Sequence, residues 1–232
     1  MSDKSSCRCV REVCVCSDSH SFSRVVFLDW DDTLLASSEL CRRGLKPQEF
    51  CAFPKDVTMF LEKLEESVID LLSTMSSKAI VYIITNSTDG WVELSCARYF
   101  PKLLPLLSNI KIISARSQYE HECENGTPYE WKRRCFEDIF KWFKDNQPSS
   151  TFEVISIGDS ESERHSCLYL QHLHSGVITK CIKFDEFPSL PHLQRQLDLL
   201  KLNLMKLLRS HQKLDLSVTL KNGTTAANAA TC

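Results

Sequence analysis

The stretch that decides the fold is Val25-Val-Phe-Leu-Asp-Trp-Asp-Asp-Thr33. Its first four residues are apolar, and a short apolar run that meets acidic and hydroxyl residues is typical of a buried strand ending at a loop. Asp29 and Asp31 stand two residues apart in that loop. If the chain turns sharply there, both carboxylates can face one pocket. The sequence therefore predicts a buried strand that delivers acidic residues to a site at its carboxyl end.

Similar apolar runs recur along the chain and alternate with helical patterns. Further strands are expected at 79–84, 110–113, 152–157 and 177–182. Helices are expected at about 56–75, 90–104 and 129–145, from near Ser160, and at about 190–209. Strands that alternate with helices favour a mostly parallel sheet covered on both faces. The predicted fold class is α/β, a Rossmann-like three-layer sandwich with five strands.

This pattern fills residues 24–211, which we interpret as one catalytic domain between two disordered tails, 1–23 and 212–232. The N-terminal tail carries a cluster of thiols, Cys7, Cys9, Cys14 and Cys16. Structural zinc sites usually use Cys-x-x-Cys pairs, which this cluster lacks. A disordered Cys-rich tail is the favoured interpretation, and a thiolate metal site and reversible palmitoylation are the alternatives.

Composition limits the classes of function. The net charge of −2 gives no surplus of Lys and Arg for displacing counterions, so no nucleic-acid partner is expected. No apolar run approaches the roughly 20 residues that cross a bilayer, and no signal-peptide core precedes residue 24. We therefore expect no transmembrane segment and a cytoplasmic or nuclear location, where most of the twelve cysteines would be reduced thiols.

Polar residues also follow the other predicted strands. Thr85 comes after the second strand and Asp159 after the fourth. Because the carboxyl ends of parallel strands meet at one edge of a sheet, these residues should join Asp29 and Asp31. Three clustered carboxylates need a cation, and oxygen ligands of this kind favour Mg²⁺.

Two further charged residues are expected at the same edge. Glu163 follows Asp159 by four positions, so on one helical face it could reach the water shell of the metal. Lys132 lies near the start of a helix and, with the Thr85 hydroxyl, could hold a phosphoryl group. Arg133 and Arg134 are neighbouring alternatives to Lys132.

Four of these motifs resemble, in order, the signatures of the haloacid-dehalogenase-like (HAD) superfamily. Asp29-x-Asp31-x-Thr33 resembles the first, and Thr85 the second. Lys132 is similar to the third, and Gly158-Asp159-x-x-x-Glu163 to the fourth. The resemblance covers roughly residues 24–185. The chain departs from the family pattern at Asp32, where Gly is commonest, and at Glu163, where Asp is usual.

The resemblance implies a magnesium-dependent phosphatase that hydrolyses phosphate monoesters. Asp29 would be the nucleophile that becomes an aspartyl-phosphate, and Asp31 the general acid and base. Mg²⁺ would be bound by the Asp29 carboxylate, the Asp31 backbone carbonyl and Asp159, with Glu163 in support. The phosphoryl oxygens would be held by Thr85, the Asn86 amide and Lys132.

The spacing between motifs leaves little room for a cap domain. Residues 34–78 and 86–131, 45 and 46 residues long, must each contain a crossover helix. An open site favours a large substrate that covers it, such as a phosphoprotein, with a small phosphorylated metabolite as the alternative. Two other functions remain open, a phosphotransferase or phosphomutase of the same fold and a catalytically inactive HAD domain that binds phosphoproteins.

Overall fold

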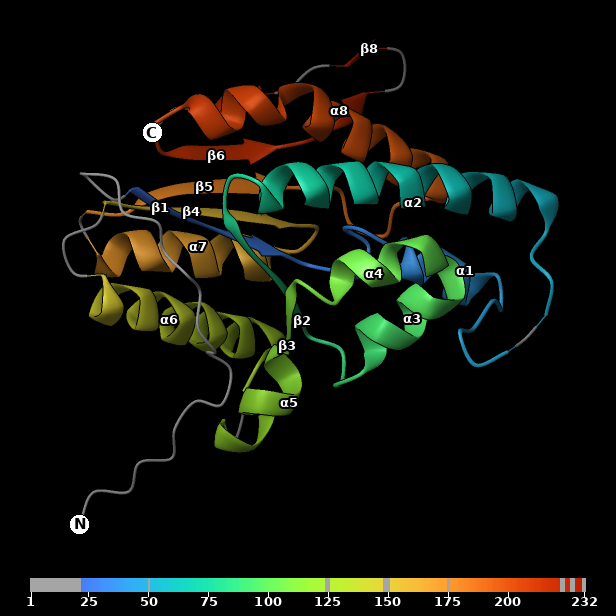
Figure 1. Cartoon of the computed structure of the whole chain (residues 1–232), viewed down its shortest axis with the longest axis horizontal. Helices are drawn as coiled ribbons and strands as arrows, with labels where there is room; N and C mark the ends of the chain where they lie inside the picture. The colour runs from blue at the N-terminus through green and yellow to red at the C-terminus, as the bar shows by residue number, and fades with distance from the viewer. Residues whose placement is uncertain are drawn as a thin grey trace.

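A computed structural model describes residues 22–49, 51–123, 126–147, 151–174, 176–221, 224–225 and 228–230. The Cys7–Cys16 cluster lies outside these residues. Helices cover both faces of a central sheet: α2 and α8 lie on one side, and α6 and α7 on the other (Figure 1). The molecule is therefore an α/β protein with three layers.

Six parallel strands form the body of the sheet, in the order β3-β2-β1-β4-β5-β6. Their bounds are β1 Phe22–Leu28, β2 Ile80–Thr85, β3 Lys111–Ser114, β4 Thr151–Gly158, β5 Ile178–Lys183 and β6 Leu214–Ser217. A short strand, β9 (Asn228–Ala230), pairs antiparallel with β6 at the edge. β7 (Leu220–Lys221) and β8 (Thr224–Thr225) form a separate hairpin.

The helices fill the crossovers between these strands. The long ones are α2 Lys55–Ser76, α6 Pro128–Asn146, α7 Glu161–Leu173 and α8 Leu190–Arg209. The shorter ones are α1 Ser37–Arg42, α3 Trp91–Tyr99, α4 Leu104–Leu107 and α5 Ala115–Tyr119, with 3₁₀ turns η1 Pro101–Leu103 and η2 Glu120–Glu122.

The apolar run of β1 shows how the layers are built. Successive side chains of a strand point to opposite faces of the sheet. Val26 and Leu28 enter the core that contains α2 and α8, whereas Val25 and Phe27 enter the core that contains α6 and α7. Both faces of the strand are buried, which is why its sequence is continuously apolar rather than alternating.

The predicted alternation of strands and helices is confirmed, but the sheet has six parallel strands rather than five. The sixth, β6, falls in residues 212–232, which were predicted to form a disordered C-terminal tail. It pairs with β5, and Asp215 within it forms an ion pair with Arg164 of α7, 2.7 Å apart. The single helix predicted at 90–104 is replaced by α3, η1 and α4, since Pro101 and Pro105 interrupt the backbone hydrogen bonds of a continuous helix.

The strand order decides where a ligand can bind. From β1 the chain builds the sheet in one direction through β2 and β3, then returns to the other side of β1 with β4, β5 and β6. The helices that follow β1 and β4 therefore diverge to opposite faces, which leaves a crevice at the carboxyl ends of these two strands. Asp29 follows β1 directly, and Asp159 follows β4.

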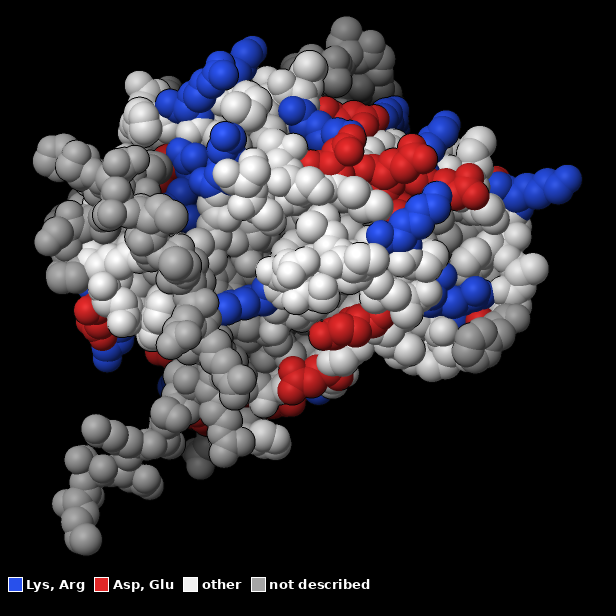
Figure 2. All heavy atoms as spheres, viewed as in Figure 1, with Lys and Arg blue, Asp and Glu red and all other residues white. Residues whose placement is uncertain are grey.

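The outer surfaces of α2 and α8 carry many charged side chains. Figure 2 shows Lys, Arg, Asp and Glu side chains interspersed over α2 and α8. In α2 the buried positions include Leu61, Leu64, Val68 and Leu72, spaced three or four residues apart as an amphipathic helix requires. Among the helices that the structure describes, none is long and apolar enough to span a membrane.

A buried ion-pair network lies at the amino ends of β1, β4 and β5. Lys180 and Glu153 are both fully buried. The Lys180 Nζ lies 2.8 Å from Glu153 Oε2 and forms an ion pair with it, although the two groups are not aligned for a hydrogen bond. Arg24 contacts the other oxygen of Glu153, and Lys180 also donates to the Leu207 carbonyl at the end of α8. Burial lowers the pKa of Lys180, and Glu153 opposes part of this shift. The network therefore connects the end of α8 to β1, β4 and β5.

Glu153→Gln should destabilise the fold by about 3 kcal/mol, because it leaves the Lys180 ammonium buried without a counter-charge. Urea unfolding would measure this as a lower midpoint with an unchanged slope. Glu161→Gln is the matched control, since its ion pair with Arg164 is partly exposed and should change stability by less than about 1 kcal/mol. Equal midpoints for the two variants would show that the buried network does not stabilise the protein.

Candidate active site

A cavity of about 530 Å³ opens at the carboxyl ends of β1, β2 and β4. The cavity is lined by all seven predicted site residues: Asp29, Asp31, Thr85, Asn86, Lys132, Asp159 and Glu163. They come from positions up to 134 residues apart in the chain. Their convergence follows from the parallel sheet, which brings the ends of non-consecutive strands together.

A tight turn after β1 places two carboxylates at this cavity. The Asp29 N–H donates to the Ile157 carbonyl of β4 at 3.0 Å, so Asp29 still follows the strand. The Trp30 carbonyl then accepts hydrogen bonds from three successive N–H groups, those of Thr33, Leu34 and Leu35. In the described residues, none of the backbone hydrogen bonds of turns, loops and helix caps has the Asp31 carbonyl as its acceptor.

Asp32 occupies the left-handed region of this turn, with φ of +55°. Gly is commonest at the matching position of the HAD signature that this segment resembles. A residue with a Cβ is strained in this conformation, and Asp is one of the few that tolerate it. The Asp32 carboxylate accepts a hydrogen bond from the Ser38 N–H at 3.0 Å, which fixes the turn to the start of α1. The departure from Gly is therefore accommodated locally.

Lys132 is the central cation of the site. It is only 2% exposed, and its Nζ lies 2.6 Å from Asp29 Oδ1 and also contacts Glu163 Oε1. Burial lowers the pKa of Lys132, but the two carboxylates outweigh this effect and raise the pKa above its ordinary value. Lys132 is therefore a protonated ammonium that is shared by two acidic side chains.

Glu163 is held by the start of α7 as well as by Lys132. Its Oε2 accepts a hydrogen bond from the Ser160 N–H at 3.0 Å, and the Ser160 side chain caps the helix in return. Burial alone would raise the pKa of Glu163, but Lys132 and Ser160 bring it below its ordinary value. Asp159 precedes the cap, so it does not share a helical face with Glu163 as predicted, although both line the cavity.

Thr33 lies between the carboxylates of Asp29 and Asp159. Its buried hydroxyl lies 3.4 Å from Asp29 Oδ2 and 3.4 Å from Asp159 Oδ1, so these two oxygens are at most twice that distance apart. Burial raises the pKa of Asp29 well above its ordinary value, Lys132 lowers it in part, and the neighbouring acids raise it further. Burial and the Glu163 carboxylate raise the pKa of Asp159 to about 7. The site holds more negative charge than Lys132 balances.

Asp31 is hydrogen bonded by three donors that surround it. Trp91 Nε1 donates to Oδ1 at 2.8 Å, and the Ser87 hydroxyl donates to Oδ2 at 2.8 Å. The Thr85 hydroxyl is 3.3 Å from the same Oδ2. Thr85 was predicted, whereas the contacts of Ser87 and Trp91 were not. Trp30 turns away from the site, fully buried, and donates to the Ser95 hydroxyl at 2.9 Å.

Asn86 links the site to the start of α6. Its Nδ2 donates to the Pro128 carbonyl at 3.1 Å. Its Oδ1 is buried and has no hydrogen-bond partner among the residues that the structure describes. The side chain therefore fixes the distance between the end of β2 and the helix that carries Lys132.

The residues of the site fit a hard divalent cation only if side-chain carboxylates and a backbone carbonyl both serve as ligands. No group of three His, Cys, Asp or Glu side chains in the described part of the chain is arranged to hold a metal ion. The set implied by the resemblance needs two carboxylates, those of Asp29 and Asp159, and the Asp31 carbonyl. Burial, together with the neighbouring acids, raises the pKa of both carboxyls, and a divalent cation bound between them would favour their ionised forms. Glu163 has both oxygens engaged by Lys132 and Ser160.

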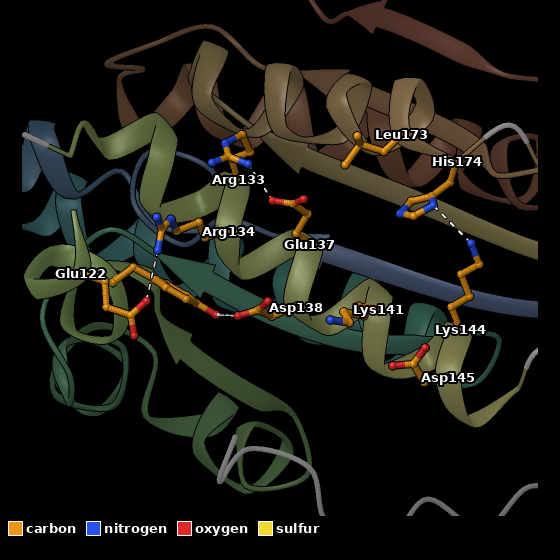
Figure 3. A pocket seen from close by; sticks show the side chains of 11 residues that line it. Glu122, Arg133, Arg134, Glu137, Asp138, Lys141, Lys144, Asp145, Leu173 and His174 are labelled. Atoms are coloured by element: carbon orange, nitrogen blue, oxygen red, sulfur yellow. Dashed lines mark hydrogen bonds and ion pairs between the residues drawn. The ribbon is translucent and has the colours of Figure 1, made fainter. Parts of the chain in front are cut away.

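A second, larger cavity of about 710 Å³ lies along α6 and α7, away from Asp29. Figure 3 shows Arg133 and Arg134 in its lining, each next to an acidic side chain. Arg133 pairs with Glu137 at 2.6 Å, and Arg134 pairs with Glu122 at 3.2 Å. Neither arginine lines the cavity of Asp29, so Lys132 is the basic residue of α6 that reaches it.

Gly158→Ala should disturb the site, because an added Cβ would lie 2.3 Å from Glu163 Cγ and would displace that side chain from Lys132. We expect a loss of about 1–3 kcal/mol in the free energy of unfolding, measured by urea denaturation. Gly176→Ala is the matched control, since a Cβ there meets no atom within 4 Å. A Gly158→Ala protein as stable as this control would contradict the close packing.

Comparison with known proteins gives no assignment. No protein-family model matches the chain, no curated protein matches it, and no solved structure matches it. The interpretation of the site therefore rests on its geometry and on the four motifs.

Proposed function

We propose that the protein is a magnesium-dependent phosphatase of the HAD type that hydrolyses phosphate monoesters through an aspartyl-phosphate on Asp29. The observation that carries the proposal is the convergence of Asp29, Asp31, Lys132 and Asp159 on one cavity at the crevice of a parallel sheet. The strand order and the helices on both faces also fit the Rossmann-like sandwich expected for that family.

Asp29 is suited to the role of nucleophile. Its carboxylate lines the cavity, and its backbone N–H is hydrogen bonded to the Ile157 carbonyl of β4. Lys132 lies 2.6 Å from one carboxylate oxygen, and would therefore also lie beside a phosphoryl group bonded to Asp29. A preformed ammonium at the point where negative charge accumulates stabilises the transition state.

Asp31 is suited to proton transfer. It stands two residues from the nucleophile, lines the same cavity and is less buried than Asp29. In the proposed reaction Asp31 gives a proton to the leaving oxygen and later removes one from the attacking water. Ser87 and Trp91 hold its two oxygens in place, so we assign them positioning roles.

Mg²⁺ would be held by the Asp29 and Asp159 carboxylates and the Asp31 carbonyl. When bound, it supplies positive charge that lets an anionic nucleophile approach an anionic phosphate. Glu163 acts mainly through Lys132, whose ammonium it orients together with Asp29. Thr85, Asn86 and Lys132 remain the proposed groups around the phosphoryl oxygens.

A phosphoprotein is the favoured substrate. Before α2, the described part of residues 34–54 adds only α1 and irregular chain, and residues 86–131 add short helices and β3. In their described residues neither segment forms a separate domain over the cavity, so a substrate large enough to cover the site itself fits best. A small phosphorylated metabolite remains the second candidate.

Two other functions stay open for the same fold. A phosphotransferase would pass the phosphoryl group to an acceptor other than water, which product analysis distinguishes from release of inorganic phosphate. A catalytically inactive domain would bind phosphoproteins without turnover. The presence of both Asp29 and Asp31 in the cavity favours catalysis over binding alone.

Asp29→Asn should reduce hydrolysis of 4-nitrophenyl phosphate by about 10⁶-fold, since it removes the nucleophile. Release of 4-nitrophenolate with Mg²⁺ and with excess chelator would be measured for both proteins. Asp70→Asn, in an exposed ion pair with Lys201, is the control and should retain activity. Turnover by the Asp29→Asn protein, or chelator-resistant turnover by the natural protein, would contradict the proposal.

Trp91→Phe should lower kcat about tenfold with little change in KM, because it removes one hydrogen bond to Asp31 but keeps an aromatic ring. Steady-state kinetics on 4-nitrophenyl phosphate would separate the two parameters. Trp142→Phe, which lies on α6 outside the cavity, serves as the control. Unchanged kcat in the Trp91→Phe protein would remove Trp91 from the set of positioning residues.

A further inference from the structure

A small cavity of about 220 Å³ adjoins the cavity of Asp29. Ser37, Cys41 and Trp91 line both cavities, so the two cavities are neighbours at these three residues. The rest of the small cavity is lined mainly by Leu45, Pro47 and Tyr99. We call it the side cavity. Its walls are largely apolar and aromatic, in contrast to the carboxylates of the neighbouring site.

The walls of the side cavity are fixed by contacts to α3. Tyr99 is buried, and its hydroxyl donates to the Leu45 carbonyl at 2.5 Å. The Leu45 N–H donates to the Leu40 carbonyl at 2.9 Å, and Gly44, with φ of +71°, lets the chain turn back after α1. These hydrogen bonds hold Leu45 and Tyr99 in place on two sides of the cavity.

Trp91 connects the side cavity to the proposed chemistry. Its Nε1 donates to Asp31, the residue that we assign to protonate the leaving oxygen, while Trp91 also lines the side cavity. A group bonded to the leaving oxygen must start beside Asp31. Because Ser37, Cys41 and Trp91 line both cavities, the side cavity lies next to the place where that group starts.

The size and lining of the side cavity define what it can hold. An apolar cavity of about 150 Å³ in another protein binds one benzene molecule, so about 220 Å³ is sufficient for one six-membered aromatic ring. Trp91 and Tyr99 offer aromatic surface for packing against such a ring. Lys46 is the charged residue among its described lining, and its side chain is 60% exposed.

We propose that the side cavity binds an apolar ring attached next to the ester oxygen of the substrate, which selects ring-bearing phosphate monoesters. This inference rests on the proposed phosphatase function. The phosphate lies beside Asp29 and Lys132, and the ring occupies the space between Trp91 and Leu45. Burial of the ring adds binding energy that a short alkyl phosphate lacks.

Benzyl phosphate and ethyl phosphate test this selection, because both release simple alcohols and so differ mainly in the ring. With Mg²⁺ present, the natural protein should hydrolyse benzyl phosphate with a kcat/KM at least about tenfold higher. Leu45→Trp fills the side cavity and should reduce this ratio to about one. Glu49→Trp, which places the same bulk on an exposed position outside the cavity, should keep the original ratio.

A second variant tests the proposal independently of whether Leu45→Trp folds. Leu45→Ala enlarges the side cavity, so naphthylmethyl phosphate, which carries a larger ring, should gain several-fold in kcat/KM relative to benzyl phosphate. Circular dichroism would establish that each variant is folded. Free phosphotyrosine and a phosphotyrosine peptide carry the same ring and ester, so the ratio of their kcat/KM values separates a small-molecule source from a protein source.

The outcomes separate the two proposals. Absence of turnover for every ester in the natural protein would refute the phosphatase function and, with it, the role of the side cavity. Equal kcat/KM for benzyl and ethyl phosphate would refute only the side cavity. A ring preference that survives in a folded Leu45→Trp protein would do the same.

Discussion

One buried ammonium organises the site. Lys132 of α6 contacts Asp29 at the end of β1 and Glu163 at the start of α7, and all three groups are nearly inaccessible to water. Charges in such surroundings are tolerated only when they are paired. The positions of α6 and α7 on the sheet are therefore tied to the position of Asp29. The packing that stabilises this face also sets the geometry of the site.

The same arrangement leaves an excess of negative charge. Lys132 balances part of the charge of Asp29 and Glu163, while the Asp159 carboxylate lies 3.4 Å from the Thr33 hydroxyl. Burial raises the pKa of Asp29 and of Asp159, and the neighbouring carboxylates add to both shifts. A divalent cation would balance the excess charge and would make both groups better ligands. The proposed magnesium site therefore rests on the clustering of buried carboxylates, since no three His, Cys, Asp or Glu side chains in the described part of the chain are arranged to hold a metal ion.

Most of the fold could be predicted because buried strands and amphipathic helices leave strong patterns. The run at 25–28 and the helix at 56–75 were predicted within a few residues of β1 and α2. β6 was missed because Leu214–Ser217 is only four residues long and mixes apolar with polar residues. Its place depends on pairing with β5 and on the Arg164–Asp215 ion pair, neither of which can be seen in a local pattern.

The features of the site also fall into those that could be predicted from the sequence and those that could not. Asp29, Thr85 and Asp159 could be predicted because each ends or directly follows a strand, and the topology brings strand ends together. The contacts of Ser87 and Trp91 with Asp31 could not, because they depend on the direction in which α3 leaves β2. Glu163 lines the cavity as predicted, yet its contacts are with Lys132 and the Ser160 cap, since α7 begins two residues later than Asp159.

The Arg24–Glu153–Lys180 network has a consequence for how the chain can change. It lies at the amino ends of the same strands whose carboxyl ends carry Asp29 and Asp159. Five residues of β4, roughly 16 Å, separate Glu153 from Gly158. Sites that far apart without common partners contribute to the free energy additively. Substitutions in this network should therefore change the stability of the fold without altering the contacts of Asp29 with Lys132.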